Sequence, residues 1–390
     1  MKSARKFAFL AATGIALWLA GSSFFSLFSK PKKLESGNSL SPILADSGSK
    51  SPLGEKRKAQ PNDEKIPESE PMEKAISLTL AKLTIGGGDG WKKSNQRELE
   101  RLRAQLVAAK IDAATVAILS FLRSGRDCPT GLDFVVVEGG LLESAPTLRM
   151  MLLDQLARID PVAAGNFSQE LLSRGCAPSE SSLALRNLHW ASSDAGAEAL
   201  FRESTLRHIS NDRWAESPEA GYLEGYDAAV QLDDPIAVGI LARRASGVPN
   251  NKTTYASQLA LERLAAGGNP SVLHAIAECE LPARFKAEIL ARADLRDQEQ
   301  RAVLESFFLD PSQNAAHGAF LLAFPMASHS SSPRLITEES LPTGGDQLER
   351  DRAALKAAKE WMAEQRFAAH QDGLDRAQKR LEDFLATNGQ

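Results

Sequence analysis

The sequence predicts an all-α protein, in which an α-solenoid of antiparallel helix pairs follows an N-terminal transmembrane helix and a disordered linker. Three observations lead to this fold class: a long uncharged stretch at the start, a proline-rich segment without aromatic residues, and apolar residues at helical spacing over most of the remaining chain. We expect five regions, which are a signal anchor at 1–30, a disordered linker at 31–70, a helical-repeat body at 71–325, a loop at 326–345 and a C-terminal amphipathic helix or helical hairpin at 346–390.

The first region contains a stretch of 22 residues without a charge, Phe7 to Phe28, which follows the basic residues Lys2, Arg5 and Lys6. As a helix it is about 33 Å long, enough to cross a hydrocarbon core of about 30 Å. We expect an uncleaved membrane anchor, because apolar residues continue beyond the small residues at 20–23. The alternative is a signal peptide that is cleaved near those small residues, which would give a secreted body.

The basic residues before the stretch favour a single-pass orientation with the amino terminus inside the cell. The body is then periplasmic or extracellular, although Lys30, Lys32 and Lys33 on the far side weaken the charge asymmetry. The charge of −4 divides into +6 over residues 1–33, −2 over residues 34–75 and −8 over the remainder. Because an acidic body repels phosphate, we expect no nucleic-acid partner.

Residues 31–75, which include the predicted linker, contain six prolines, and Ile43 and Ile66 are their only β-branched apolar side chains. Such a segment buries too little apolar area to offset its chain entropy, and this predicts disorder. A flexible chain of that length spans about 35 to 40 Å, so the body would float near the membrane.

Helix starts in the body are marked by a capping side chain followed by proline, a residue that is tolerated at the first helical position. The pairs are Asp160-Pro161, Asp234-Pro235, Asn269-Pro270 and Asp310-Pro311. Apolar stripes accompany these signals, as at Leu99, Leu102 and Leu106 or from Leu148 to Ile159.

The helix starts also recur with a regular period. First helices are expected near Pro146, Pro178, Pro218 and Thr253, in steps of 32, 40 and 35 residues. Second helices are expected near Pro161, Asp194, Pro235 and Pro270, in steps of 33, 41 and 35 residues. This period is typical of two-helix repeats, in which each pair buries its apolar side against the next pair.

On this period and on the helix-start residues, residues 94–325 resemble HEAT-like and TPR-like helical-repeat proteins, although the Trp, Leu-Gly and Tyr pattern of tetratricopeptide repeats is absent. The stretches Ser124 to Gly131 and Leu141 to Arg149 are also similar to bacterial envelope-anchored helical proteins. The resemblance implies an extended, concave surface that binds other proteins, and it implies no particular chemistry.

Side chains that carry chemistry show no recognisable arrangement. There is no Gly-x-Ser-x-Gly elbow, and the three cysteines, Cys128, Cys176 and Cys279, lie far apart without metal-ligand spacing. The histidines do not form an i, i+4 pair; they are His189, His208, His274, His317, His329 and His370. We therefore expect no enzyme activity, no cofactor and no metal site.

One segment departs from the helical rhythm. Residues 131–140 contain Phe134 to Val137, which fit one short strand or an extended plug between two helices. Polar groups gather around it, and irregular segments on rigid scaffolds often carry binding residues. The candidate binding residues are Arg126, Asp127, Cys128, Asp133 and Glu138. The alternative for this segment is a structural insertion without a ligand.

These observations favour a membrane-tethered helical-repeat scaffold that binds a protein or peptide partner in the cell envelope. A second hypothesis is a structural or self-assembling envelope protein, because Leu348, Leu355 and Met362 recur every seven residues near the C-terminus. That terminal segment either caps the solenoid or pairs with another helix, and capping is the more common role. A third hypothesis is an exported hydrolase, which requires a deep pocket with converging polar groups.

Overall fold

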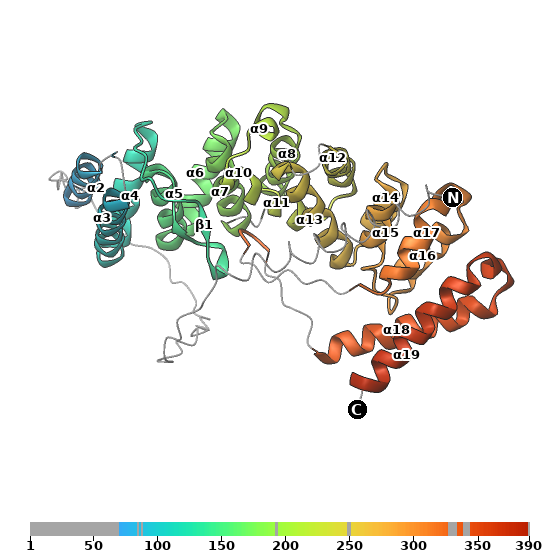
Figure 1. Cartoon of the computed structure of the whole chain (residues 1–390). Coiled ribbons are helices and arrows are strands. Elements are labelled where there is room, and N and C mark those ends of the chain that lie inside the picture. The colour runs from blue at the N-terminus through green and yellow to red at the C-terminus, as the bar shows by residue number, and fades with distance from the viewer. Residues whose placement is uncertain are drawn as a thin grey trace, which may run out of the picture. The chain divides into compact units, whose positions relative to one another are not determined.

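The computed structural model describes residues 70–83, 86, 89–191, 194–247, 251–326, 334–337 and 344–388. These residues all belong to one compact unit and are largely helical, which confirms the predicted all-α class (Figure 1). The predicted anchor at Phe7 to Phe28 and the predicted linker lie outside the described residues. Among the helices that are described, none combines the length and the apolar character needed to cross a bilayer.

The helices follow one another along the chain, and the connections are longest after α4 and after α17. In the first half they are α2 (Glu70–Lys82), α3 (Asp89–Ala108), α4 (Ile111–Arg123), α5 (Leu148–Ile159), α6 (Pro161–Arg174), α7 (Pro178–Ala191), α8 (Ala195–Ser210) and α9 (Asp212–Glu216). Then come α10 (Ala220–Glu224), α11 (Asp227–Leu232), α12 (Pro235–Ala245), α13 (Lys252–Gly267), α14 (Pro270–Glu278), α15 (Ala283–Leu290), α16 (Gln298–Leu309), α17 (Asn314–Ala323), α18 (Gly344–Ala363) and α19 (Gln371–Asn388).

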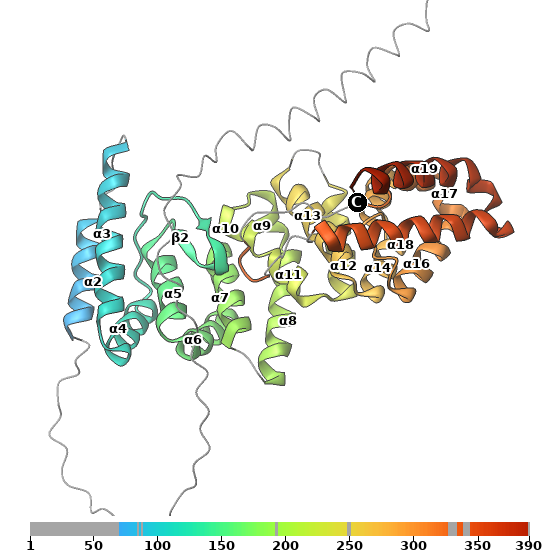
Figure 2. The ribbon, with the colours of Figure 1, turned by 90° about the horizontal axis from the view of Figure 1, so that it is seen from below.

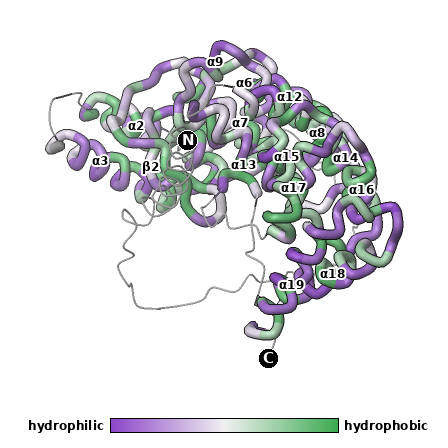
Figure 3. Tube along the Cα trace, turned by 45° about the vertical axis from the view of Figure 1, so that its right-hand side comes forward, coloured by the Kyte–Doolittle hydropathy of each residue, from purple (hydrophilic) through white to green (hydrophobic). Residues whose placement is uncertain are grey.

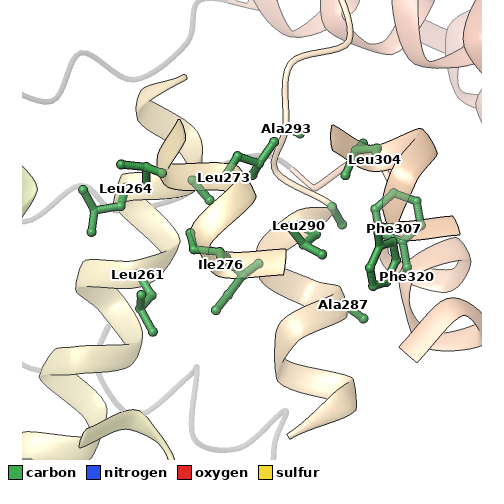
Figure 4. Close-up of a cluster of buried hydrophobic side chains, with 14 of the residues drawn as sticks. Leu261, Leu264, Leu273, Ile276, Ala287, Leu290, Ala293, Leu304, Phe307 and Phe320 are labelled. Carbon is green, nitrogen blue, oxygen red and sulfur yellow. The ribbon is translucent and has the colours of Figure 1, made fainter. Parts of the chain in front are cut away.

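Helices pack mainly against helices that are close in sequence, such as α6 against α7, α12 against α13 and α18 against α19. Figure 4 shows one such stack, in which Leu261 and Leu264 of α13 lie beside Leu273 and Ile276 of α14. Hydrophilic residues predominate on α3, whereas α17 is mostly hydrophobic (Figure 3). Each helix therefore contributes an apolar face to a core that it shares with its sequence neighbours.

Three of the four Asp/Asn-Pro pairs begin α-helices. In each, the side chain before the proline accepts a hydrogen bond from a backbone N–H of the first turn: Asp160 from Ala163 at 2.9 Å, Asp234 from Ile236 at 2.7 Å and Asn269 from Ser271 at 3.0 Å. The fourth pair opens a 3-10 helix at Pro311–Gln313, and α17 starts directly after it.

The helix expected after Pro218 is divided into the short helices α10 and α11. The buried His208 side chain hydrogen-bonds through Nε2 to the carbonyl of Tyr222 at 3.0 Å. The Tyr226 N–H, which would bond that carbonyl in an α-helix, donates to Leu223 instead at 3.2 Å. Gly225 makes room for the ring, since a Cβ there would lie 2.3 Å from His208 Nε2.

The irregular segment between α4 and α5 forms a small hairpin. Strand β1 (Val135–Val136) pairs antiparallel with β2 (Leu142–Ser144), with Val135 opposite Ser144. A 3-10 turn, Glu138–Gly140, joins the strands, and its two glycines have φ values of +77° and +70°. The sequence pointed to a short strand here but gave no sign of the second strand.

The C-terminal region is a pair of helices, α18 and α19, that fold back on each other through the 3-10 segment Gln365–His370. The fully buried Trp361 joins this pair to α16, because its indole Nε1 donates to Glu305 Oε1 at 2.9 Å. Its ring centroid lies 5.5 Å from that of Phe308 and 5.8 Å from that of Phe367. The pair therefore shares a core with the preceding helices.

We predict that Trp361→Ala lowers the free energy of unfolding by about 3 to 5 kcal/mol, because it leaves a large cavity and removes one of the donors to Glu305, which keeps its ion pairs with Arg301 and Arg366. The midpoint of urea denaturation of the purified chain measures the effect. Phe384→Ala in the same helix pair is the control, because Phe384 is 44% exposed. Equal midpoints for the two variants would contradict the shared core.

Candidate functional site

The predicted binding segment starts in the loop after α4. Asp127 Oδ1 accepts hydrogen bonds from the backbone N–H of Cys128 at 2.7 Å and of Arg149 at 3.0 Å. It therefore fixes the first turn of α5, because helix-start amides lack partners within the helix. The Arg126 guanidinium lies 5.3 Å from the centroid of the Phe121 ring.

The remaining predicted residues are spread over the hairpin. Cys128 is half-buried, and burial together with the charge of Asp127 raises the pKa of its thiol, which opposes formation of a nucleophilic thiolate. Asp133 and Glu138 are exposed. The backbone carbonyl of Asp133 accepts a hydrogen bond from Ser144 Oγ at 2.8 Å within the hairpin. Among the described residues, no ion pair joins either carboxylate to Arg126.

A buried ion pair holds the far side of this hairpin. Asp154 Oδ1 on α5 lies 2.7 Å from Arg186 Nη1 on α7, and both side chains are buried. The pair also binds the hairpin backbone: Asp154 accepts from the Leu142 N–H at 3.0 Å, and Arg186 donates to the Gly140 carbonyl at 2.7 Å. Two side chains complete the network, since Arg158 donates to Asp154 Oδ2 at 3.0 Å and Arg186 donates to Asn187 Oδ1. This arrangement is structural, since buried charges need such partners.

A serine and a histidine are close together between α7 and α8. Ser181 Oγ lies 3.0 Å from His208 Nδ1. Because the Tyr222 carbonyl can only accept, His208 Nε2 carries the proton and Nδ1 accepts from the Ser181 hydroxyl. Burial lowers the pKa of His208 to about 4. Both side chains are closed off from solvent, so the pair holds two helices together and does not present a nucleophile to a substrate.

A second buried carboxylate arises where the helix expected after Pro218 is broken. Asp227 is the first residue of α11, and its side chain is buried. Its Oδ1 lies 2.7 Å from Nη2 of Arg263 on α13, which is also buried. One oxygen of this carboxylate therefore has a cationic partner, and the rest of its acceptor capacity is directed to another part of the chain.

That part is a four-residue segment, Arg334 to Thr337, which we call the strap. It is the short orange segment next to α10 and α11 in Figures 1 and 2, apart from α17 and α18 on either side of it in sequence. Asp227 Oδ2 accepts from the backbone N–H of Ile336 at 2.6 Å and of Thr337 at 3.0 Å. Asp227 Oδ1 accepts from the Thr337 hydroxyl at 2.6 Å, and Arg263 donates to the same hydroxyl oxygen.

Apolar contacts complete the attachment of the strap. Leu335 is fully buried and Ile336 nearly so, and both belong to the core of the first half of the described chain. Leu335 approaches the hairpin at Gly140, where a Cβ would lie 2.3 Å from the Leu335 carbonyl oxygen. Only glycine fits there, and its φ of +70° disfavours any other residue as well. The strap thus lies between the hairpin and α11.

A pocket of about 240 Å³ adjoins the strap and is lined by groups of both charges. Glu224 lies in its wall, and burial raises the pKa of this carboxyl group, whereas the charges of Arg334 and Arg263 lower it. The open side carries Tyr255, which is 60% exposed. A larger hollow of about 510 Å³ lies at α7, α8 and α11, but its Arg202 is already paired with Asp234 at 2.5 Å.

Sequence reasoning missed Asp227, Arg263 and the strap. Asp227 and Thr337 are 110 residues apart, so no local spacing joins them. One signal was present, since Leu335 and Ile336 are adjacent large apolar residues in a loop that is otherwise mostly polar. Within the described residues, no three His, Cys, Asp or Glu side chains are placed to hold a metal ion together.

We predict that Asp227→Asn speeds hydrogen exchange at the Ile336 and Thr337 amides by about tenfold or more, because a hydrogen bond to a charged group contributes about 1.5 to 3 kcal/mol. Exchange measured by mass spectrometry or NMR checks this. Asp212→Asn is the matched control, because the Asp212 side chain is 83% exposed and pairs with Arg244 outside the site. Equal exchange in the two variants would exclude the assigned hydrogen bonds.

The low pKa of His208 has a consequence for stability. Because the folded value of about 4 lies below the ordinary value of 6.5, the unfolded chain binds this proton more readily, and stability falls as pH decreases from 6.5 to 4. At the low end of this pH range, the loss of unfolding free energy due to His208 approaches about 3 kcal/mol. Urea denaturation between pH 7 and pH 4.5 should show a smaller pH dependence for His208→Gln than for the natural chain. An unchanged dependence would be contrary to this account.

Comparison with known proteins identifies no relative of this chain, because no protein-family model, no curated protein and no solved structure matches it.

Proposed function

We propose that the chain is a membrane-tethered helical-repeat scaffold that binds a protein or peptide partner in the cell envelope and is not an enzyme. In this proposal Phe7 to Phe28 anchor the chain as a single pass, the linker separates the body from the bilayer, and the body is periplasmic or extracellular. The consecutive helix pairs form an α-solenoid, whose surface presents the Asp227 site.

The observation that carries the proposal is the way in which Asp227 and Arg263 hold the strap, whose backbone bends at Leu335 and Ile336. Two consecutive N–H groups of the strap donate to one carboxylate oxygen, at 2.6 and 3.0 Å. Recognition of main-chain groups together with apolar side chains is a common way for proteins to bind peptides. The adjoining pocket and the exposed Tyr255 leave an approach for a partner from outside.

Two further features support a scaffold. Contacts extend from each helix pair to the next, as α12 packs on α14 and α14 on α16, which is the neighbour-to-neighbour pattern of repeat proteins. The charge of −8 after residue 75 opposes nucleic-acid binding and leaves proteins as the expected partners.

The C-terminal pair supports a capping role more than self-association. Its large apolar side chains are buried within the chain, where they cover α16 and α17; they include Trp361, Phe367, Leu374 and Leu381. A helix that paired with a second copy through this face would first have to expose these side chains. Terminal repeats of solenoids need a cover of this kind.

We predict that a photo-crosslinking residue in place of Tyr255 yields a discrete crosslinked product in intact cells of the native host, because Tyr255 lines the open side of the site. The same residue in place of Leu322 is the matched control, because Leu322 is 71% exposed but lies on α17. Asp227→Asn, combined with the crosslinker at 255, should remove the product. Identical products from positions 255 and 322, or none from either, would contradict partner binding at this site.

A further inference from the structure

The strap shows what kind of ligand the Asp227 site accepts. Recognition has three parts: two backbone N–H groups taken by one carboxylate oxygen, a hydroxyl placed between Asp227 and Arg263, and two apolar side chains in the core. The first part depends only on a backbone bent so that two consecutive N–H groups face one oxygen. The second requires threonine or serine, and the third requires two adjacent large apolar residues.

Charge adds a fourth element at the amino-terminal end of the strap. Arg334 and Glu224 both line the pocket, and the positive charge of Arg334 lowers the pKa of Glu224 against the effect of burial. Glu224 is half-buried, and a second positive charge beside it, in addition to Arg263, stabilises its charged form, so the pocket favours a basic residue at this position. The preferred ligand therefore reads, in order, basic, apolar, apolar and hydroxyl.

The receptor groups also depend on having an occupant. Asp227 is buried, and with the strap removed its Oδ2 would lose the two backbone N–H groups that donate to it. An unsatisfied buried acceptor costs about 1 to 3 kcal/mol, and more when it is charged. Helices α11 and α13 thus hold a preformed hydrogen-bond acceptor, which favours binding of either the strap or a similar segment.

We infer that Asp227 and Arg263 form a receptor for bent peptide segments with a basic-apolar-apolar-threonine sequence, and that the strap occupies this receptor as an internal competitor of the partner. This rests on the proposed function and specifies the partner of the same site. The partner is a protein segment of that chemistry, which replaces Arg334 to Thr337 and takes over their hydrogen bonds to Asp227.

Tethering sets the strength of the competition. The strap is joined to α17 and α18 by short connections, and short tethers give effective concentrations in the millimolar range. A free peptide with the same contacts must compete with that concentration, so it binds the natural chain weakly. Release of the strap should strengthen binding of the peptide without any new contact.

The experiment uses the full chain and a fluorescein-labelled peptide with the sequence of residues 332–339, SPRLITEE. Fluorescence anisotropy gives its affinity for the natural chain, for the strap-released double variant Leu335→Asp, Ile336→Asp, and for that double variant with Asp227→Asn added. We expect the released variant to bind at least about tenfold more tightly than the natural chain, and Asp227→Asn to remove at least about tenfold of the affinity. Equal affinities for the natural and released chains, or no effect of Asp227→Asn, overturn the inference.

Two controls keep the test decisive. Circular dichroism checks that the released variant keeps its helix content. If the released variant loses helix content, the single variant Thr337→Ala is used in its place. It removes one hydroxyl and should strengthen peptide binding by a smaller factor. A peptide with the change Ile336→Asp should bind at least about tenfold more weakly than the natural sequence, because a charge would enter an apolar pocket. Equal binding of the two peptides would overturn the proposed sequence preference.

Failure of this inference can be told apart from failure of the proposed function. If the peptide does not bind the released chain but the crosslink at position 255 stays specific and sensitive to Asp227→Asn, the chain binds a partner and the strap is not its competitor. If the peptide binds as expected and no crosslink forms in cells, the receptor chemistry stands and the cellular partner role is wrong.

Discussion

Burial of one apolar face per helix is the constraint on which the rest of the structure depends. A single amphipathic helix cannot cover its own apolar stripe, and here each stripe is covered by helices that are close in sequence. The same requirement recruits the C-terminal pair, because Phe308 of α16 packs against Trp361 and Phe367. Once helices are packed in this way, polar and irregular segments must find partners at the places where the packing is interrupted.

The helix packing is interrupted at the hairpin and at the strap, and the same kind of interaction holds both segments. In each, a buried aspartate on one helix pairs at 2.7 Å with an arginine on another and accepts hydrogen bonds from the backbone of a non-helical segment. Asp154 and Arg186 hold the hairpin, and Asp227 and Arg263 hold the strap. The ion pair offsets the desolvation of the carboxylate, and the segment supplies further donors. Arg158 supplies one more donor to Asp154. A buried ion pair of this kind specifies where a non-helical segment lies more than it adds to stability.

The two segments are adjacent, which explains why this region is the candidate site. The Leu335 carbonyl packs against Gly140, whose own carbonyl accepts from Arg186. The hairpin that Arg186 fixes is therefore one wall of the place where the strap lies, and α11 is the other. Ordered elements on both sides of the strap favour peptide binding, because an ordered receptor loses little entropy on binding.

The sequence was sufficient for the all-α class and for three of the four capped helix starts at proline, because these depend on apolar spacing and on contacts within one turn. It was insufficient at α10 and α11, where the break is caused by His208, which lies 14 residues before the carbonyl that it binds. It was also insufficient for the site, since the strap and Asp227 meet across 109 residues. Residues 131–140 had drawn attention by their irregular pattern, and Gly140 at their end does contact the strap. Arg126, Asp127, Cys128, Asp133 and Glu138 remain a prediction as binding residues.

The most direct test of the account is a crystal structure of the strap-released chain, Leu335→Asp and Ile336→Asp, with the peptide SPRLITEE bound. We predict a peptide between the hairpin and α11 that is bent like the strap, with two consecutive amides donating to the Asp227 carboxylate and the threonine hydroxyl beside Arg263. A peptide bound elsewhere, or an empty site at saturating peptide concentration in which Asp227 keeps its position, would contradict the claim that this carboxylate is a receptor for peptide backbone.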